Sequence, residues 1–131
     1  MSDPEQPTEL RQRVAEAIKK IRLELRWKPG KDEEHPIKRI ERGHLPPGAT
    51  LAEYEAIIRE VLSDPAARLY VFRSGSTDYP TVVADRTGKR WLVMFSLEGV
   101  LETAFPPDDP DVYFRDEPRY IEIGGIQEVL S

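Results

Sequence analysis

The sequence predicts an α+β fold in which two N-terminal helices pack on an antiparallel sheet of four to five strands. In the first 65 residues, apolar side chains recur every three or four positions, as on the buried face of a helix. From Leu69 onward the pattern changes to short runs of β-branched and aromatic residues separated by turn residues. Such close spacing favours antiparallel neighbours. We therefore expect one domain over residues 8–131, preceded by a polar, disordered segment over residues 1–7.

The first helix is predicted from Thr8 to about Arg26. Pro29 and Gly30 follow it and favour a turn. Residues 31–34 read as a polar loop or a short helical turn. Beyond them, the spacing of two isoleucines predicts one more helical turn, with the isoleucines on the core and the cations facing away. The apolar stripe of the first helix is Leu10, Val14, Ala17, Ile18, Ile21 and Leu25, and the later turn contains Ile37, Lys38, Ile40 and Arg42.

The second helix is predicted to begin after Thr50 and to end at residues 63–65. Thr50 and Glu53 have the spacing of a capping box, in which each side chain bonds the backbone of the other residue. The strands that follow are expected at residues 69–72, 81–84, 91–95, 100–105 and 120–123. Trp91 reads as a core residue of the third strand. Residues 106–111 read as a loop, and no helix is expected after Gly124 and Gly125.

Composition excludes several classes of protein. The chain has no cysteine, no apolar stretch long enough for a membrane span, no secretory signal and no glycine-rich nucleotide loop, so we expect a cytoplasmic protein without a cofactor. The net charge of −5 argues against general nucleic-acid binding. Residues 19–42 nevertheless carry a net charge of +4 and residues 98–128 one of −7. This asymmetry either focuses an anionic ligand on one face or is solvated surface.

The segment from His35 to His44 is the sharpest chemical feature. It holds both histidines of the chain and Lys38. Cleavage of RNA by its own 2′-hydroxyl needs a proton acceptor, a proton donor and a cation for the phosphate, and these three side chains supply that set. The alternative is that His35 begins a helical turn and His44 occupies a loop, without chemistry. A metal site needs a third ligand that the sequence does not nominate.

Three other residues are weaker candidates. Thr103 lies near the end of a predicted strand, where its hydroxyl can donate to a phosphate oxygen or can simply suit a strand. Arg119 and Tyr120 can hold a phosphate and a base, or can decorate a sheet edge. No motif for a covalent nucleophile accompanies them.

The order of these parts resembles the small ribonuclease fold shared by barnase, EndoU, colicin ribonuclease domains and RelE, in particular its phage-borne and polymorphic-toxin members. Three stretches carry the resemblance, which would cover about residues 33–130: HPIKRIERGH at 35–44, LVMF at 92–95 and ETAFPP at 102–107. It implies metal-independent cleavage of RNA. It also implies a general acid or base at His35 or His44, a phosphate clamp at Lys38 or Arg39 with Arg42 nearby, and a transition-state donor at Thr103.

The sequence therefore supports a metal-independent endoribonuclease. Its resemblance implies a toxin that acts on tRNA or mRNA and is neutralised by an immunity or antitoxin protein. Two alternatives stay open. One is a non-enzymatic, antitoxin-like interaction module that uses its acidic C-terminal third, and the other is a degenerate form of the fold that binds RNA without cutting it.

Overall fold

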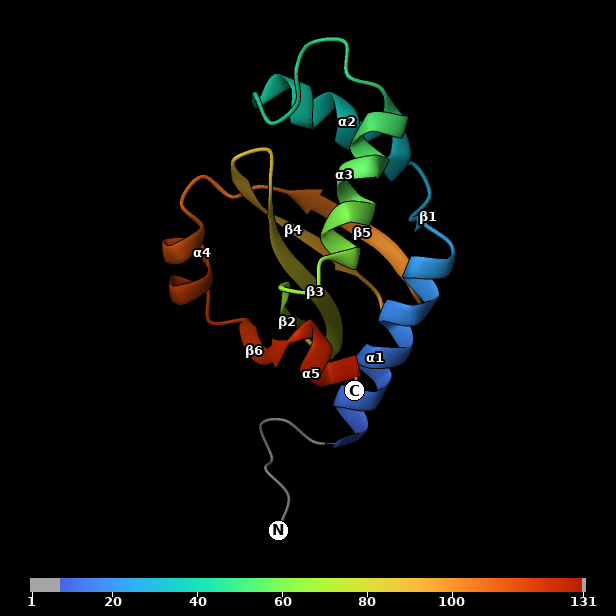
Figure 1. Cartoon of the computed structure of the whole chain (residues 1–131), viewed down its shortest axis with the longest axis vertical. Coiled ribbons are helices and arrows are strands. Elements are labelled where there is room, and N and C mark those ends of the chain that lie inside the picture. The colour runs from blue at the N-terminus through green and yellow to red at the C-terminus, as the bar shows by residue number, and fades with distance from the viewer. Residues whose placement is uncertain (1–7, 131) are drawn as a thin grey trace.

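The computed structural model describes residues 8–130, which form a six-stranded sheet with helices on both faces (Figure 1). The predicted disordered segment 1–7 lies outside the described residues. The helices are α1 (Thr8–Leu23), α2 (Lys31–Glu41), α3 (Leu51–Ser63), α4 (Pro110–Asp116) and α5 (Ile126–Leu130). The strands are β1 (Arg26–Trp27), β2 (Arg68–Ser74), β3 (Thr77–Arg86), β4 (Lys89–Phe95), β5 (Val100–Phe105) and β6 (Tyr120–Gly125).

The predicted α+β class is confirmed, with N-terminal helices on a mostly antiparallel sheet. The strand order is β1-β5-β4-β3-β2-β6, and only the β1–β5 pair is parallel. The sheet has six strands rather than four to five because β1 contains two residues, too few to give a periodic signal. All five predicted strands are present; β2, β3, β4 and β6 extend further than the sequence indicated, and β5 has the predicted bounds.

The two faces of the sheet carry separate cores. The larger core joins one face to α1, α3 and α5, and the opposite face carries a smaller, largely aromatic cluster that α4 covers. Trp91 is fully buried in the larger core, as predicted. The capping box of α3 is also confirmed: the Glu53 amide donates to the Thr50 hydroxyl at 3.1 Å, and the Thr50 amide donates to Glu53 Oε1 at 2.9 Å.

Three helix boundaries differ from the prediction. The first helix ends at Leu23 rather than near Arg26, because Arg26 and Trp27 pair with β5. The predicted loop over 106–111 contains the start of α4, whose first turn has Pro110 at its beginning and Asp109 as its cap. A short helix, α5, does follow Gly125, contrary to the prediction.

The segment between Gly30 and Arg42 departs most from the prediction. It forms one helix of 11 residues, α2, with Pro36 inside it. A proline in a helix interior removes a backbone hydrogen bond, and for that reason the sequence did not predict one continuous helix across Pro36. Ile37 is 57% exposed, so the expectation that it packs on the core is wrong, whereas Ile40 does pack there. The buried face of α2 instead presents His35 and Arg39.

Within residues 8–130, no helix is both long and apolar enough to cross a membrane.

Two glycines test how closely α1 approaches the turn before β5. Gly88 and Gly99 both have a positive φ, +76° and +82°. A Cβ at Gly99 would lie 2.9 Å from the Lys20 Cβ, whereas one at Gly88 would have no atom within 4 Å. We expect Gly88→Ala to cost about 1 kcal/mol of unfolding free energy through backbone strain alone. Gly99→Ala should cost at least about 1 kcal/mol more, since α1 must also move. Urea denaturation measures both, and equal costs would contradict this packing.

Candidate active site

Two predicted residues that are distant in the sequence meet where α2 approaches the end of β5. The Thr103 hydroxyl lies 3.1 Å from His35 Nδ1, although 68 positions separate these residues. Strand β1 pairs with β5 only as far as Leu101. The edge of β5 beyond that point is therefore open to α2, and the hydroxyl and the imidazole come together there.

A group of buried aromatic side chains fixes this junction. The Tyr54 hydroxyl, on α3, donates a hydrogen bond to the Ala104 carbonyl of β5. The Trp27 ring packs 5.6 Å from the Tyr54 ring and 5.9 Å from His35, between ring centroids. Trp27 is itself held by a 2.7 Å hydrogen bond from its Nε1 to Glu55. The end of β5 and the His35 ring are thus placed by contacts from β1 and α3.

His35 is held as a neutral imidazole. Its side chain lies in a site where the residue is only 6% exposed. Burial, together with the positive charges of Arg39, Lys31 and Lys38, lowers the pKa of His35 to about 4. Its Nε2 is buried and has no hydrogen-bond partner among the described residues. The ring can therefore orient Thr103 through Nδ1, but Nε2 is not open to a ligand in this conformation.

The second histidine is held by a buried arginine. Arg39 is 3% exposed, and its Nη1 donates to His44 Nδ1 at 3.2 Å. Because a guanidinium only donates, Nδ1 must be the acceptor, and a neutral His44 carries its proton on Nε2. Burial and the charge of Arg39 lower the pKa of His44 from its ordinary value. The same guanidinium lies over the Phe105 ring, 5.3 Å from its centroid.

The turn at the end of α2 brings His44 back to Arg39. Gly43 has a φ of +74°, and the backbone amide of His44 donates to the Arg39 carbonyl at 2.8 Å. The Gly43 amide donates to the Ile40 carbonyl at 3.0 Å. These two bonds make a Schellman motif, which needs a residue that tolerates a left-handed backbone at position 43. The Gly43-His44 pair in the sequence thus encodes the position of the imidazole.

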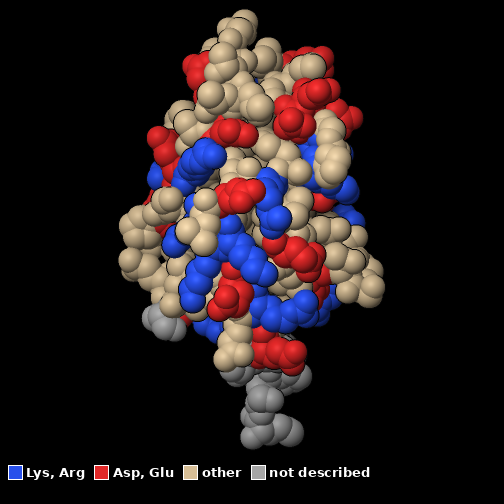
Figure 2. Space-filling view, turned by 90° about the vertical axis from the view of Figure 1, so that its right-hand side faces the viewer, with Lys and Arg blue, Asp and Glu red and all other residues tan. Residues whose placement is uncertain are grey.

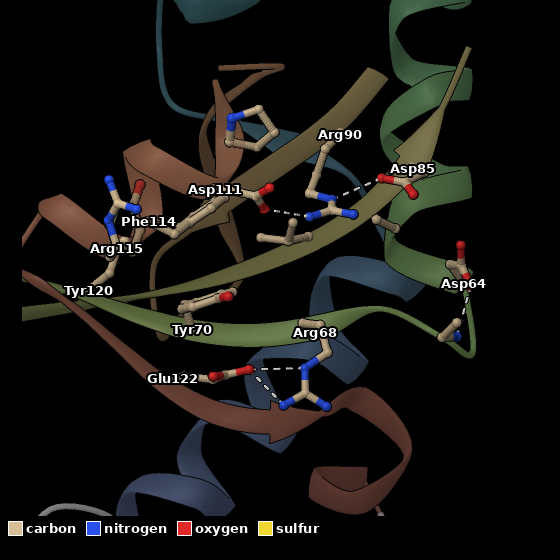
Figure 3. Close-up of a pocket in the computed structure, with 14 residues that line it drawn as sticks. Asp64, Arg68, Tyr70, Asp85, Arg90, Asp111, Phe114, Arg115, Tyr120 and Glu122 are labelled. Carbon is tan, nitrogen blue, oxygen red and sulfur yellow. Dashed lines mark hydrogen bonds and ion pairs between the residues drawn. The ribbon is translucent and has the colours of Figure 1, made fainter. Parts of the chain in front are cut away.

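Arg39 is a buried arginine that pairs with no carboxylate within residues 8–130, whereas several exposed or half-buried arginines are ion-paired. Arg68 pairs with Glu122 at 2.6 Å, and Arg90 lies between Asp85 and Asp111 at 3.0 and 3.3 Å, in a pocket on the α4 face of the sheet (Figure 3). Arg73, Arg86, Arg115 and Arg119 are also ion-paired. A buried cation without a counter-ion is costly, so Arg39 is the group that gains most from an anionic ligand.

A groove of about 710 Å³ lies beside His44, between the end of α2 and α4. Its walls are cationic on the α2 side and acidic near the start of α4, and its floor is aromatic and proline-rich. The lining residues are Arg42, His44, Phe105, Pro106, Pro107, Asp108, Asp109, Val112 and Tyr113. His44 thus lines the groove and is hydrogen-bonded to the buried Arg39.

The remaining predicted residues lie in two places. Lys38 and Arg42 are exposed on α2, as expected from their shared face. Arg119 and Tyr120 lie at β6, the edge of the sheet opposite β1. There Arg119 pairs with Glu117 at 2.6 Å, and Tyr120 is 9% exposed with its hydroxyl 3.1 Å from that of Tyr113. The structure does not bring them to the junction.

Sequence reasoning missed the supporting aromatic residues. Tyr54 lies within the predicted second helix and Trp27 directly after the predicted first helix, but the sequence assigned no role to either side chain. A tyrosine on a buried stripe is the available signal, because its hydroxyl usually finds a partner when the ring is buried. Nothing in the sequence identified Ala104 as that partner.

Surface charge does not mark a general polyanion-binding face on the side that carries α1. Figure 2 shows this face, where Lys and Arg side chains are interspersed with Asp and Glu. Among residues 8–130 no group of three His, Cys, Asp or Glu side chains is placed to hold a metal ion.

Comparison with known proteins does not assign the chain to a class. No protein-family model, curated protein or solved structure matches it. The resemblance to the small ribonucleases thus remains an expectation from three short stretches of sequence.

The neutral state of His35 predicts a specific pH dependence of stability. Its pKa is about 4 in the folded chain and about 6.5 when unfolded, so the unfolded chain binds a proton between these values and the folded chain does not. The free energy of unfolding should therefore be full above pH 7 and fall as the pH drops from 6.5 toward 4. We expect His35→Asn to make this fall shallower than in the parent, as measured by urea denaturation at pH 7.0 and 4.5. An unchanged fall would rule out a neutral, buried His35.

Proposed function

We propose that the chain is a metal-independent endoribonuclease whose active site is the junction of α2 with the end of β5. The observation that carries the proposal is the convergence of His35, Arg39, His44 and Thr103 at one place beside a groove. A cation that binds the phosphate, an imidazole that accepts a proton and a hydroxyl that donates to a phosphate oxygen are groups that can promote phosphate cleavage by an adjacent 2′-hydroxyl.

Arg39 is the group that binds the scissile phosphate. Its guanidinium is buried without a carboxylate from residues 8–130, and a phosphate oxygen would supply the missing negative charge. Arg42 lines the groove and can contact a neighbouring phosphate. Lys38 extends from the exposed side of α2, where it adds to the attraction of the RNA backbone.

His44 is the proton acceptor in this mechanism. Its Nδ1 is occupied by the Arg39 N–H in the free protein. When a phosphate takes that N–H, Nδ1 is released and accepts the proton of the 2′-hydroxyl, whose oxygen attacks phosphorus and displaces the 5′-oxygen. The departing 5′-oxygen takes a proton from a water molecule, and the proton on His44 neutralises the hydroxide that remains. Binding of the phosphate and activation of the base are thereby coupled.

Thr103 stabilises the charge that develops on the phosphate, and His35 positions it. A neutral His35 with its proton on Nδ1 donates to Thr103 Oγ1, which leaves the threonine proton free for a phosphate oxygen. His35 acts through Thr103 in this scheme, in keeping with its buried Nε2.

A binding protein without catalytic activity is the second candidate function. Burial of His35 and the ion pairs that six arginines make with carboxylates favour it, because those guanidiniums are already partnered. Such a protein would use the acidic residues 98–128 to hold a basic partner, or would hold RNA without cutting it. Binding of a basic protein that weakens with added salt, together with no cleavage of RNA, would favour this function.

Cleavage of RNA in the presence of a chelator tests the first proposal. The parent should cut tRNA or total RNA in EDTA, and His44→Ala should lower the rate by about 10²–10⁴-fold because the general base is lost. Arg119→Gln is the matched surface control and should keep the parent rate. Intact RNA with the parent protein, or full activity in both His35→Ala and His44→Ala, would remove the proposal.

Two threonines on the same face of the sheet separate the role of Thr103 from a general strand effect. Thr103→Val removes the hydroxyl and should lower the rate about 10²-fold, as for loss of one transition-state donor, whereas Thr103→Ser should retain most of it. Thr81→Val is the control: Thr81 donates to the Tyr79 carbonyl at 3.2 Å, away from α2. Initial rates with one RNA substrate measure all three variants. Equal rates for the two valine variants would contradict the assigned role.

A further inference from the structure

We infer that α2 is a lid that opens on two hinges, at Gly30 and Gly43, while the rest of the fold stays intact. Figure 1 shows this helix at one end of the molecule, between the loop that follows β1 and the loop that leads to α3. Opening brings His35 and Arg39 from the buried face of α2 into solvent. It is a property of the fold and does not depend on the proposed cleavage of RNA.

The attachment of α2 to the rest of the chain is weak. Among residues 8–130, its side chains make one hydrogen bond to another element, between His35 Nδ1 and the Thr103 hydroxyl at 3.1 Å. Their other hydrogen bond and their one ion pair stay within residues 31–44. The remaining attachment is the packing of Ile40 on the core and of two aromatic rings against the buried face. Few directional bonds must therefore break for α2 to move.

Helix α3, which contacts α2, is attached differently. Near its start, the Tyr54 hydroxyl donates to the Ala104 carbonyl of β5. Near its end, the Arg22 side chain of α1 donates to the Leu62 carbonyl at 2.8 Å. Bonds from two other elements thus hold α3 at both ends, so α2 is the helix of this pair that can leave the core by itself.

The buried face of α2 also leaves polar atoms without partners. His35 Nε2 and Arg39 Nε are buried and form no hydrogen bond with any other described residue. A buried polar atom without a partner loses its hydration and gains nothing in return, and water restores its hydrogen bond once the atom is exposed. Pro36 lies on the same face and lacks the amide that a helix interior normally uses. The closed position is therefore weakened by groups that the open position satisfies.

Two glycines supply the hinges. Gly30 is the N-cap of α2, with a φ of +85° and no side-chain cap, and Gly43 follows the C-cap residue with a φ of +74°. A Cβ at either position would have no atom within 4 Å, so neither glycine makes room for a neighbour. Both can instead leave the left-handed region at little cost, which lets the backbone turn there while the helix between them moves as one body.

Opening of α2 gives an anion access to Arg39. In the closed form the residue is 3% exposed, and its one side-chain hydrogen bond goes to His44. No carboxylate of residues 8–130 pairs with this guanidinium, so an anion that meets it in the open form gains a free partner. The population of the open form then sets the apparent affinity for that anion.

Amide hydrogen exchange of the unmodified protein, followed by mass spectrometry, tests the lid. After correction for intrinsic rates, residues 37–41 should exchange at least about tenfold faster than residues 55–62 of α3. Low concentrations of urea should accelerate exchange only in α3, because local opening exposes little surface and global unfolding exposes much. Equal rates with the same dependence on urea would overturn the inference, since α2 would then open only when the whole chain unfolds.

Two alanine variants extend the same experiment to the hinge. Gly43→Ala and Gly75→Ala each place a side chain in open space at a positive φ, +74° and +60°, but Gly75 lies between β2 and β3, outside the lid. Strain at position 43 acts on the closed lid and should raise the exchange of residues 37–41 about fivefold, which corresponds to about 1 kcal/mol. Gly75→Ala should lower global stability by a similar amount and leave that exchange unchanged. Equal acceleration in both variants, or none in Gly43→Ala, would overturn the inference.

Neither measurement uses RNA, so the lid and the proposed function fail separately. Intact RNA in the cleavage assay would remove the ribonuclease and leave the lid. Exchange of α2 at the rate of α3 would remove the lid and leave the ribonuclease.

Discussion

The hydrogen bond from the Tyr54 hydroxyl to the Ala104 carbonyl holds the end of β5 against α3, and the candidate active site is arranged around it. The Tyr54 ring is fully buried between Trp27 and Trp91, and burial raises the pKa of its hydroxyl, which stays protonated as a donor. The Ala104 side chain points to the face of the sheet that α1, α3 and α5 cover. Because side chains alternate along a strand, Thr103 and Phe105 point to the opposite face. Those two side chains are the ones that α2 contacts.

The burial of Arg39 is the main cost of this arrangement. A guanidinium taken from water loses several kcal/mol of hydration, and an ion pair ordinarily offsets part of this loss. Here the described residues offer only the His44 ring and the face of Phe105, which are weaker partners than a carboxylate. Protonation of His44 would add a second positive charge in contact with the first. Burial and the charge of Arg39 therefore both favour a neutral His44 imidazole.

The sequence predicts the helices and strands of this protein better than the contacts between them. Thr50 and Glu53 predict the start of α3 because capping is a local interaction. The strands are predictable because the pattern of their side chains is local too. Pro36 concealed the start of α2, and β1 was too short to detect. The contact of His35 with Thr103 depends on a parallel β1–β5 pairing between segments more than 70 residues apart, for which no local pattern exists. Arg39 was expected at the surface, since charged residues are rarely buried.

The acidic surface and the proposed RNA chemistry become compatible once charge is considered by location. A net charge of −5 weakens long-range attraction of a polyanion, and that attraction is also screened by salt. The field of Arg39 acts instead over a few ångströms in a poorly hydrated site, where the same charge interacts more strongly than in water. A protein built in this way gains little affinity for RNA in general. Under the proposed function, it would gain affinity instead for a phosphate that reaches Arg39 beside the groove.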